Sequence, residues 1–298
     1  MAKLSVVINN LNEKDNLKKA IASVKKLADE IVVIDMESSD GSAEIAQKAG
    51  ATVYPHKRLD YVEPARNFGI EKANGPWILI LDPDERISPK LQENIRQIIA
   101  ESEADYYRLP RKNIVFGKWL EYSRWWPDYN IRLFKKGAVL WNEIIHGVPL
   151  THGRGLDLEA KEDMAIIHRH YDSIEQYVER MNRYTTVQAR LLHKQEKKFS
   201  WQALIEKPSA EFLSRYFYGQ GYKDGVHGLG VSLLQAVSEL VVYLKLWQMA
   251  EFPQKTIKVA DSINAFKHNE KSFHYWYNNT LVEEYGGVIN RIKRKLKI

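Results

Sequence analysis

The stretch "LILDPDERISP", residues 79–89, carries the signal on which the fold depends. An apolar run ends there at three carboxylates, Asp82, Asp84 and Glu85, with a proline between the first two. A continuous apolar run is typical of a strand that is buried on both faces of a sheet. The chain therefore leads a buried strand into a cluster of like charges, which is costly unless another group offsets their repulsion.

Two explanations fit the acidic cluster. Carboxylate oxygens are ligands that Mg²⁺ and Mn²⁺ prefer, and a site with few protein carboxylates leaves coordination positions for water and substrate oxygens. Alternatively, Asp84 and Glu85 lie at the positive end of a helix that begins near Ser88-Pro89. These residues alone do not decide between a metal site and a helix cap.

Strand and helix patterns alternate through residues 3–110. We expect strands at 4–9, 30–35, 51–55 and 77–82, and helices at 13–27, 40–50 and 63–74. This alternation predicts an α/β fold with a doubly wound, mostly parallel sheet and right-handed crossovers. In such a sheet the ligand lies beyond the carboxyl ends of the strands, so Asp35 and Asp82 should face the same crevice.

Polar residues also follow the second strand and begin the third helix. Asp35 ends a strand and is suited to bind a nucleotide base or ribose, whereas Ser39 to Ser42 are explained by turn and capping chemistry. Arg66 has a planar guanidinium that suits a phosphate or a base. The alternative for Arg66 is a surface salt bridge to Glu63 or Glu71.

The composition limits the chemistry and the compartment. The 298 residues include no cysteine, which excludes disulfides, thiolate metal sites and cysteine nucleophiles and fits a reducing compartment. The apolar run from Leu4 to Ile8 is too short for a signal peptide, and no stretch reaches the roughly 18 uncharged apolar residues of a spanning helix. We therefore expect a cytoplasmic protein, either soluble or peripheral on a membrane.

Three motifs, in this order, resemble those of glycosyltransferase family 2, whose members are inverting enzymes with the GT-A fold. They are "SVVINNLNE" at 5–13, "EIVVIDMESSDGS" at 30–42 and "ARNFGIEKANGPWILILDPDE" at 65–85. Two departures matter. Asn9-Asn10 stand where Pro-Thr or Pro-Ala is common, and Met36 replaces the second aspartate of the second motif.

The resemblance implies a nucleotide-diphosphate sugar as the donor, with UDP as the expected nucleotide, and Mg²⁺ or Mn²⁺ as the cofactor. By the same resemblance, Asp82 faces the ribose, Asp84 binds the metal on the diphosphate, and Asp82 is the second candidate metal ligand of the Asp-x-Asp motif. The other donor-binding positions that it implies are Asn12, Glu13, Asp35 near the base, and Arg66 near the base and phosphates.

Later segments resemble the subgroup that includes lipopolysaccharide-core β-glucosyltransferases, among them "YNIRLFKKGAVLWNEIIHGVP" at 129–149. This implies a hexose transfer to a glycan or lipid-linked glycan in cell-envelope polysaccharide synthesis, and no nucleic-acid partner. An inverting transfer needs a base that takes the proton of the acceptor hydroxyl. The subgroup often has a glutamate where this chain has Gly147, so the candidates are Glu143, which we favour for its position, Asp128 and His146.

The domain organisation follows from these patterns. We expect a GT-A catalytic domain at 1–170, with a nucleotide-sugar-binding half at 1–110 and an acceptor-side half at 111–170. Residues 171–298 are expected to form a mostly helical region.

Two kinds of side chain in the acceptor-side half are weaker indications of function. Trp125-Trp126 could stack on a sugar ring or belong to a core. The histidines at 146, 152, 168 and 170 fit no zinc motif, so we expect structural roles for them in place of a zinc site, with His146 also a candidate base.

The last part of the chain bears on membrane binding. The helix expected at 226–249 has apolar residues at helical spacing, and residues 290–298 carry five basic side chains. The helix either packs against the rest of the protein or lies in a membrane interface, and the basic residues either form a solvated tail or bind an anionic surface. A lipid-linked acceptor would explain both features and would place the protein on the inner face of the cytoplasmic membrane.

Two alternative functions are weighed against glycosyl transfer. A nucleotidyltransferase also places carboxylates and a metal at strand ends, but it usually has a glycine-rich phosphate loop, and "NNLNEKDN" at 9–16 contains no glycine. A catalytically silent protein that binds nucleotide sugars or a membrane is the other alternative.

Overall fold

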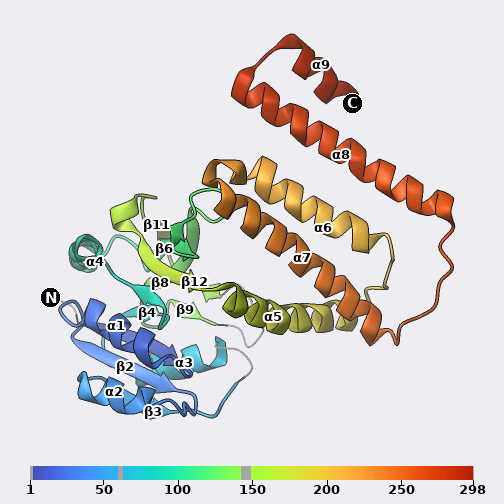
Figure 1. Cartoon of the computed structure of the whole chain (residues 1–298). Helices are drawn as coiled ribbons and strands as arrows, with labels where there is room; N and C mark the ends of the chain where they lie inside the picture. The colour runs from blue at the N-terminus through green and yellow to red at the C-terminus, as the bar shows by residue number, and fades with distance from the viewer. Residues whose placement is uncertain (1–2, 60–62, 142–148, 298) are drawn as a thin grey trace. The chain divides into compact units, whose positions relative to one another are not determined.

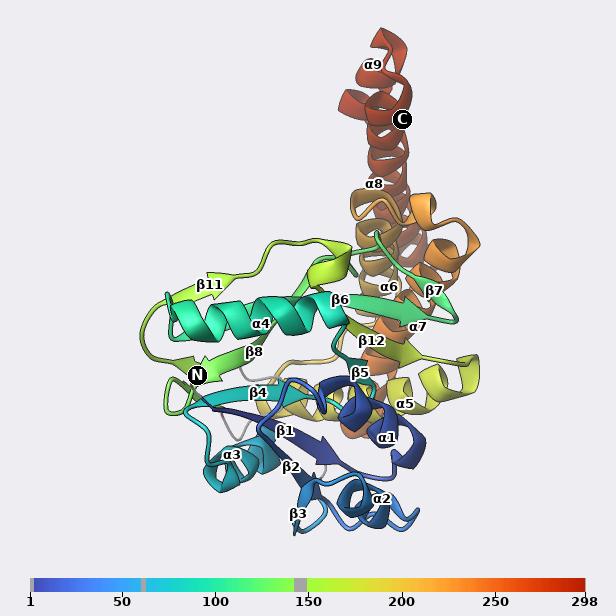
Figure 2. The same ribbon diagram turned by 90° about the vertical axis from the view of Figure 1, so that its left-hand side faces the viewer.

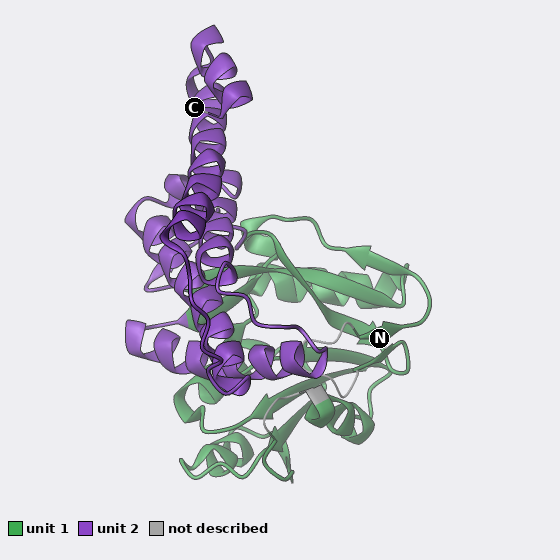
Figure 3. Cartoon of the chain, turned by 90° about the vertical axis from the view of Figure 1, so that its right-hand side faces the viewer, with its two compact units in different colours: residues 1–114, 126–170 green, residues 115–125, 171–298 purple. Residues whose placement is uncertain are grey.

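The computed structural model describes residues 3–59, 63–141 and 149–297. The chain forms two compact units, one of residues 1–114 and 126–170 and one of residues 115–125 and 171–298 (Figure 3). The segment 115–125, which we expected in the catalytic domain, packs with the second unit.

The first unit is built on a sheet whose parallel half begins the chain (Figure 2). Its parallel strands, in sheet order, are β3 (Thr52–Pro55), β2 (Glu30–Asp35), β1 (Leu4–Asn10) and β4 (Trp77–Leu81). In register, Asn10 lies beside Asp35, and Ile8 lies beside Leu81. The carboxyl ends of three neighbouring strands therefore lie at one edge, as the α/β prediction requires.

The sheet continues past β4 with antiparallel strands. These are, in sheet order, β8 (Asp128–Lys135), β6 (Tyr106–Val115), β12 (Ile166–Tyr171) and β5 (Glu85–Arg86), and β11 (Gly155–Asp157) pairs with β6. β8 pairs with β4 so that Phe134 lies beside Ile78. Two short strands, β9 (Val139–Leu140) and β10 (Leu150–Thr151), pair separately.

Helices cover both faces of this sheet. They are α1 (Lys14–Val24), α2 (Ser42–Lys48), α3 (Glu63–Lys72) and α4 (Pro89–Glu101), with a short 3₁₀ turn at Glu162–Met164. Alternate residues of β1 belong to two cores: Ile8 packs in the core that includes residues of α1 and α4, and Val7 packs in the core that includes residues of α3. A strand that is buried on both faces reads as a continuous apolar run, which is how the sequence revealed it.

The second unit is mostly helical (Figure 1). Its helices are α5 (Ile174–Lys194), α6 (Ala203–Leu213), α7 (Val226–Met249), α8 (Val259–Tyr285) and α9 (Val288–Leu296), and its short elements are β7 (Lys118–Trp119), a π-turn at Ser214–Tyr218 and a 3₁₀ turn at Gly221–Asp224. α5 begins at a Ser173 cap, whose hydroxyl accepts a hydrogen bond from the N–H of Gln176 at 3.2 Å. The α/β fold class with a helical C-terminal region is thus confirmed.

α7 packs in the bundle on one face and is exposed on another. One face packs in the bundle, through residues such as Val231, Val242 and Leu246, while Leu233 and Val237 on another face are 49% and 44% exposed. Among the described residues it is the helix with the length and apolar composition to cross a membrane, and 33% of its most apolar window is buried. Core helices of soluble proteins meet the same criteria, so these two properties do not assign it to a membrane.

Gly69 of the third motif permits the close approach of α3 to the sheet. A Cβ atom at this position would lie 2.5 Å from Cγ1 of Val7 and 3.0 Å from Cγ1 of Ile34, both buried in the same core. Gly230 in α7 is also a helical glycine, but a Cβ there would have no neighbour within 4 Å.

We therefore predict opposite effects for the same substitution at these two glycines. Both Gly69→Ala and Gly230→Ala gain about 1 kcal/mol of helix propensity, but only Gly69→Ala overpacks a core, at a cost of about 1–3 kcal/mol. Urea unfolding should place Gly69→Ala below Gly230→Ala in free energy of unfolding by that 1–3 kcal/mol cost. Equal stabilities would contradict the close-approach account.

Candidate functional site

The acidic stretch after β4 forms a tight turn. The N–H of Glu85 donates to the carbonyl of Asp82 at 2.9 Å, and Pro83 occupies the position of a β-turn that its fixed φ favours. The carboxylate of Glu85 in turn accepts a hydrogen bond from the N–H of Asp82 at 3.0 Å. The turn therefore holds the carboxylates of the motif at fixed positions beyond the sheet.

Arg132 of β8 neutralises two of these carboxylates. Its Nη2 lies 2.5 Å from Oδ2 of Asp82 and 2.6 Å from Oε1 of Glu85. The side chains of Arg132 and Glu85 are 2% and 0% exposed, so this ion pair is buried. A buried charge without a partner would cost several kcal/mol, which explains why these residues occur together.

The helix-cap explanation for Glu85 is wrong. α4 is capped by Ser88, whose hydroxyl accepts a hydrogen bond from the N–H of Leu91 at 3.1 Å, and its first turn contains no acidic residue. Glu85 instead lies in β5, beside His168 of β12. The local sequence fits a helix cap, but the buried guanidinium from β8 decides where the carboxylate lies.

Asp82 is held by a second arginine from the third motif. Nη2 of Arg66 in α3 lies 2.9 Å from Oδ1 of Asp82, so the salt bridge to Glu71 that we considered is replaced by one inside the site. Burial alone would raise the pKa of Asp82, but the guanidinium charges of Arg132 and Arg66 outweigh it and hold that pKa well below its usual range. Burial likewise opposes the charge of Arg132, and the two carboxylates reverse this and raise its pKa.

Asp128 lies at the start of β8 in a network of donors. Its Oδ2 accepts from Nη2 of Arg111 at 2.6 Å and from Nδ2 of Asn113 at 3.1 Å, and its Oδ1 accepts from Nδ2 of Asn130 at 3.1 Å. Burial raises the pKa of this carboxyl, but the charge of Arg111 and these hydrogen bonds lower it overall. A carboxylate with a lowered pKa and several donors is a weak proton acceptor, so these surroundings favour a positioning role for Asp128.

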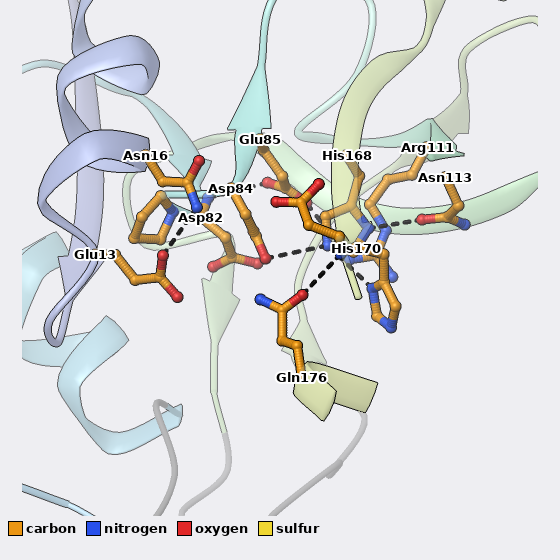
Figure 4. Close-up of polar contacts among 12 residues, drawn as sticks. Glu13, Asn16, Asp82, Asp84, Glu85, Arg111, Asn113, His168, His170 and Gln176 are labelled. Atoms are coloured by element: carbon orange, nitrogen blue, oxygen red, sulfur yellow. Dashed lines mark hydrogen bonds and ion pairs between the residues drawn. The ribbon is translucent and has the colours of Figure 1, made fainter. Parts of the chain in front are cut away.

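Asp84 faces His168, which comes from β12 (Figure 4). Nε2 of His168 lies 3.6 Å from Oδ2 of Asp84 and 3.2 Å from Nδ1 of His170. Nδ1 of His168 lies 2.6 Å from Oδ1 of Asn113, so it carries the proton and donates to that amide oxygen. Nε2 of His168 therefore faces both Asp84 and His170.

This pair fits a divalent cation. A carboxylate oxygen and an imidazole nitrogen are suitable donors for Mn²⁺, and a hydrogen-bonded second ring nitrogen is the usual support of a metal-binding histidine. Among the described residues, no group of three His, Asp or Glu side chains forms a metal site.

A second set of polar side chains lies at the carboxyl ends of β1 and β2. Asp35 is 8% exposed and accepts hydrogen bonds from Nδ2 of Asn10 at 3.4 Å and from the N–H of Ser38 at 3.1 Å. Oδ1 of Asn12 accepts from the N–H of Ser39 at 2.8 Å, which ties the two loops together. Asp40 accepts from the N–H of Ser42 at 3.0 Å, in agreement with the turn chemistry expected there.

The two asparagines that depart from the family pattern include buried side-chain atoms without a hydrogen-bond partner in the described part of the chain: both polar atoms of Asn9, but only Oδ1 of Asn10. Among the described residues, neither polar side-chain atom of Asn9 has a hydrogen-bond partner, and the residue is 3% exposed. Buried polar groups in folded proteins are almost always hydrogen-bonded.

Most of the predicted site residues lie in described parts of the first unit, and the others lie outside the described residues. The Asp82, Asp84, Arg66 and Asp128 side chains form one connected network, and Glu13 accepts from Nδ2 of Asn16 at 2.9 Å at the start of α1. Glu143 and His146 lie outside the described residues.

Sequence reasoning missed four members of this site. Arg132, Arg111 and Asn113 gave no local signal, since each lies in a strand of mixed composition far from the acidic motif. His168 was expected to be structural, and the structure places it against Asp84. Its alternation with His170 in a short strand was a signal that the two rings share one side of the sheet.

Comparisons with known proteins identify the family of this chain. Residues 5–154 match the family described as Glycosyl transferase family 2. An uncharacterized glycosyltransferase of Rickettsia typhi is 31% identical over 273 residues, which cover 89% of this chain and 92% of that protein. The lipopolysaccharide core biosynthesis glycosyltransferase LpsC of Rhizobium meliloti is 26% identical over 254 residues, covering 82% of this chain and 92% of LpsC.

Solved structures show a more distant likeness. Glucosyl-3-phosphoglycerate synthase of Mycobacterium tuberculosis, in complex with Mn²⁺, UDP and glucosyl-3-phosphoglycerate, superposes with a TM-score of 0.33 at 21% identity. The match covers 37% of this chain and 44% of the synthase.

Removal of the Glu85 charge should strongly destabilise the fold. Glu85→Gln leaves the buried guanidinium of Arg132 with one carboxylate, and breaking a buried pair costs about 3–5 kcal/mol. The control is Asp157→Asn, which breaks the exposed pair with Arg108 and should cost at most about 1 kcal/mol. Chemical unfolding of both variants measures the difference, and a loss for Glu85→Gln as small as that of the control would contradict the buried-pair account.

Proposed function

This chain belongs to glycosyltransferase family 2, and from this premise we propose that it transfers a sugar from a UDP-linked donor, with inversion, to a glycan or lipid-linked glycan of the cell envelope. The observation that carries the proposal is the Asp-x-Asp turn, in which Asp82 is held by two arginines and Asp84 faces His168. The similarity to LpsC supports the cell-envelope acceptor.

The donor is proposed to lie beyond the carboxyl ends of β1, β2 and β4. In this proposal Asp35 binds the base, and Asn12 and Glu13 are further donor-binding residues; Oδ1 of Asn12 ties its loop to Ser39. Asp82 stays ionised because two guanidinium groups lower its pKa, so it can accept hydrogen bonds from ribose hydroxyls. Arg66 adds a fixed positive charge on the side of the phosphates.

Asp84 and His168 are the residues that would hold Mg²⁺ or Mn²⁺, in our proposal. Such an ion would neutralise the negative charge of the diphosphate leaving group. The role of the protein is to keep both donor atoms in place: the turn fixes Asp84, and Asn113 orients the ring of His168.

The proposed inversion requires a base on the acceptor side. The base removes the proton of the acceptor hydroxyl while this oxygen attacks the anomeric carbon and the diphosphate departs. Of the candidates, Asp128 has a lowered pKa and several hydrogen-bond donors around it, so it is the weakest proton acceptor. We therefore propose Glu143 or His146 as the base, and we favour Glu143.

The proposed setting is the inner face of the cytoplasmic membrane. A lipid-linked acceptor would bring its sugar to that surface, and the exposed apolar face of α7 together with the basic residues near the end of the chain supports peripheral binding there.

The first experiment measures metal-dependent donor binding and turnover. In calorimetry, Mn²⁺ should tighten UDP binding to the unaltered protein, and Asp84→Ala should abolish this gain, while the control Asp261→Ala, an exposed carboxylate in α8, should keep it. Slow release of UDP from a UDP-sugar would support a transferase over a silent binding protein, and pyrophosphate release would indicate a nucleotidyltransferase. UDP affinity that is equal with and without Mn²⁺ would contradict the proposed metal site.

The second experiment tests the base. Glu143→Gln should lower kcat by about 100-fold or more, because general base catalysis typically contributes 10²–10⁴-fold, and it should leave the UDP affinity unchanged. Asp128→Asn is the comparison: it should lower thermal stability through the loss of the Arg111 pair. Full kcat in Glu143→Gln would move the base to His146, to Asp128 or elsewhere.

A further inference from the structure

We propose that α9 is an interfacial helix that binds the surface of anionic phospholipids. This proposal deepens the membrane-surface part of the proposed function by naming the element and the lipid chemistry. α9 spans Val288–Leu296 and lies against α8 in the second unit (Figure 1).

The apolar residues of α9 form one exposed face. Val288, Ile289, Ile292 and Leu296 are 70%, 69%, 52% and 60% exposed. At 3.6 residues per turn, these four positions fall within an arc of about 100°, with Ile292 and Leu296 between Val288 and Ile289. Large apolar side chains that are exposed together on one side of a helix are typical of a surface that binds a protein or a membrane.

The opposite side of α9 packs on α8. Nη1 of Arg294 donates to Oδ1 of Asn279 at 3.0 Å, and Nζ of Lys297 lies 6.0 Å from the ring centre of Tyr275. Both partners belong to α8, so these contacts fix the rotation of α9. The apolar arc therefore faces away from α8.

Basic residues flank the apolar arc on both sides. By helical spacing, Arg291 and Lys295 lie along one border of the arc, and Lys293 lies along the other; all three are exposed. Long basic side chains in this position can keep their charges at the lipid headgroups while the arc enters the acyl boundary. Residues 286–298 contain no acidic side chain to oppose this attraction.

This combination favours a lipid surface over other occupants. A nucleic acid would neutralise the cations but leave the apolar arc in water, and a second copy of this helix would bring like charges together. The outer face of α7 has apolar residues but lacks such cations, since Nζ of Lys245 is engaged with α5 at 2.7 Å from Oδ1 of Asn182. Selectivity for anionic lipid therefore points to α9.

The test is co-sedimentation of the full chain with vesicles, without any sugar donor. One set of vesicles contains phosphatidylcholine alone, and the other contains phosphatidylglycerol as well. The triple variant Arg291→Gln, Lys293→Gln, Lys295→Gln removes the flanking charges, and Lys194→Gln, Lys197→Gln, Lys198→Gln removes the same number of exposed charges near the end of α5. Ile289→Ser with Ile292→Ser tests the arc, and Leu233→Ser with Val237→Ser tests α7.

The proposal expects binding to the anionic vesicles that weakens in high salt. Each cation near an anionic surface contributes about fivefold, so the α9 charge variant should lose on the order of 100-fold in binding, while the α5 control should lose far less. The α9 serine variant should also lose binding, with the thermal midpoint of both α9 variants unchanged because the altered side chains are exposed.

Three results would overturn the proposal. They are unchanged binding in both α9 variants, loss of binding only in the α7 variant, or a change of dimer to monomer in the α9 variants by light scattering without lipid. Because the assay contains no donor, its failure leaves the assignment as a transferase untouched, and failure of the UDP experiments leaves the lipid result untouched.

Discussion

The first unit depends on one buried guanidinium. Arg132 is 2% exposed and lies between the carboxylates of Asp82 and Glu85, which follow a strand that is buried on both faces. Two like charges at such a place would repel each other and would be poorly solvated, so the fold needs a cation that is fixed from another element. β8 supplies it by pairing antiparallel with β4.

This constraint separates the roles of the three carboxylates. Glu85 is used for structure, because it is fully buried and pairs with Arg132. Asp82 is shared between Arg132 and Arg66, which keeps it ionised at the edge of the sheet. Asp84 is directed to His168, whose ring is oriented by Asn113, and Asn113 also donates to Asp128. The proposed metal site and the arginines that hold Asp82 thus belong to a single polar network.

The second unit distributes its exposed apolar surface unevenly. α7 has an exposed apolar face but packs through another face into the bundle, and its Lys245 is held by hydrogen bonds to α5. α9 combines its apolar arc with flanking cations. Hydrophobic area and positive charge act together at an anionic interface, and they occur together in the shorter helix.

The sequence alone determined the parallel half of the sheet, the order of its helices and the family, because these follow from local periodicity and from short motifs. Asp35, Arg66, Asp82 and Asp84 could be named for the same reason. Only the tertiary structure decided that Glu85 is a buried ion-pair partner, and that Arg132 and His168 belong to the site. The physical reason is that a charge near a buried strand end is stabilised by whichever group the fold brings there. Here that group lies 50 residues away from Asp82 in the chain, on a strand whose neighbour in the sheet no local pattern specifies.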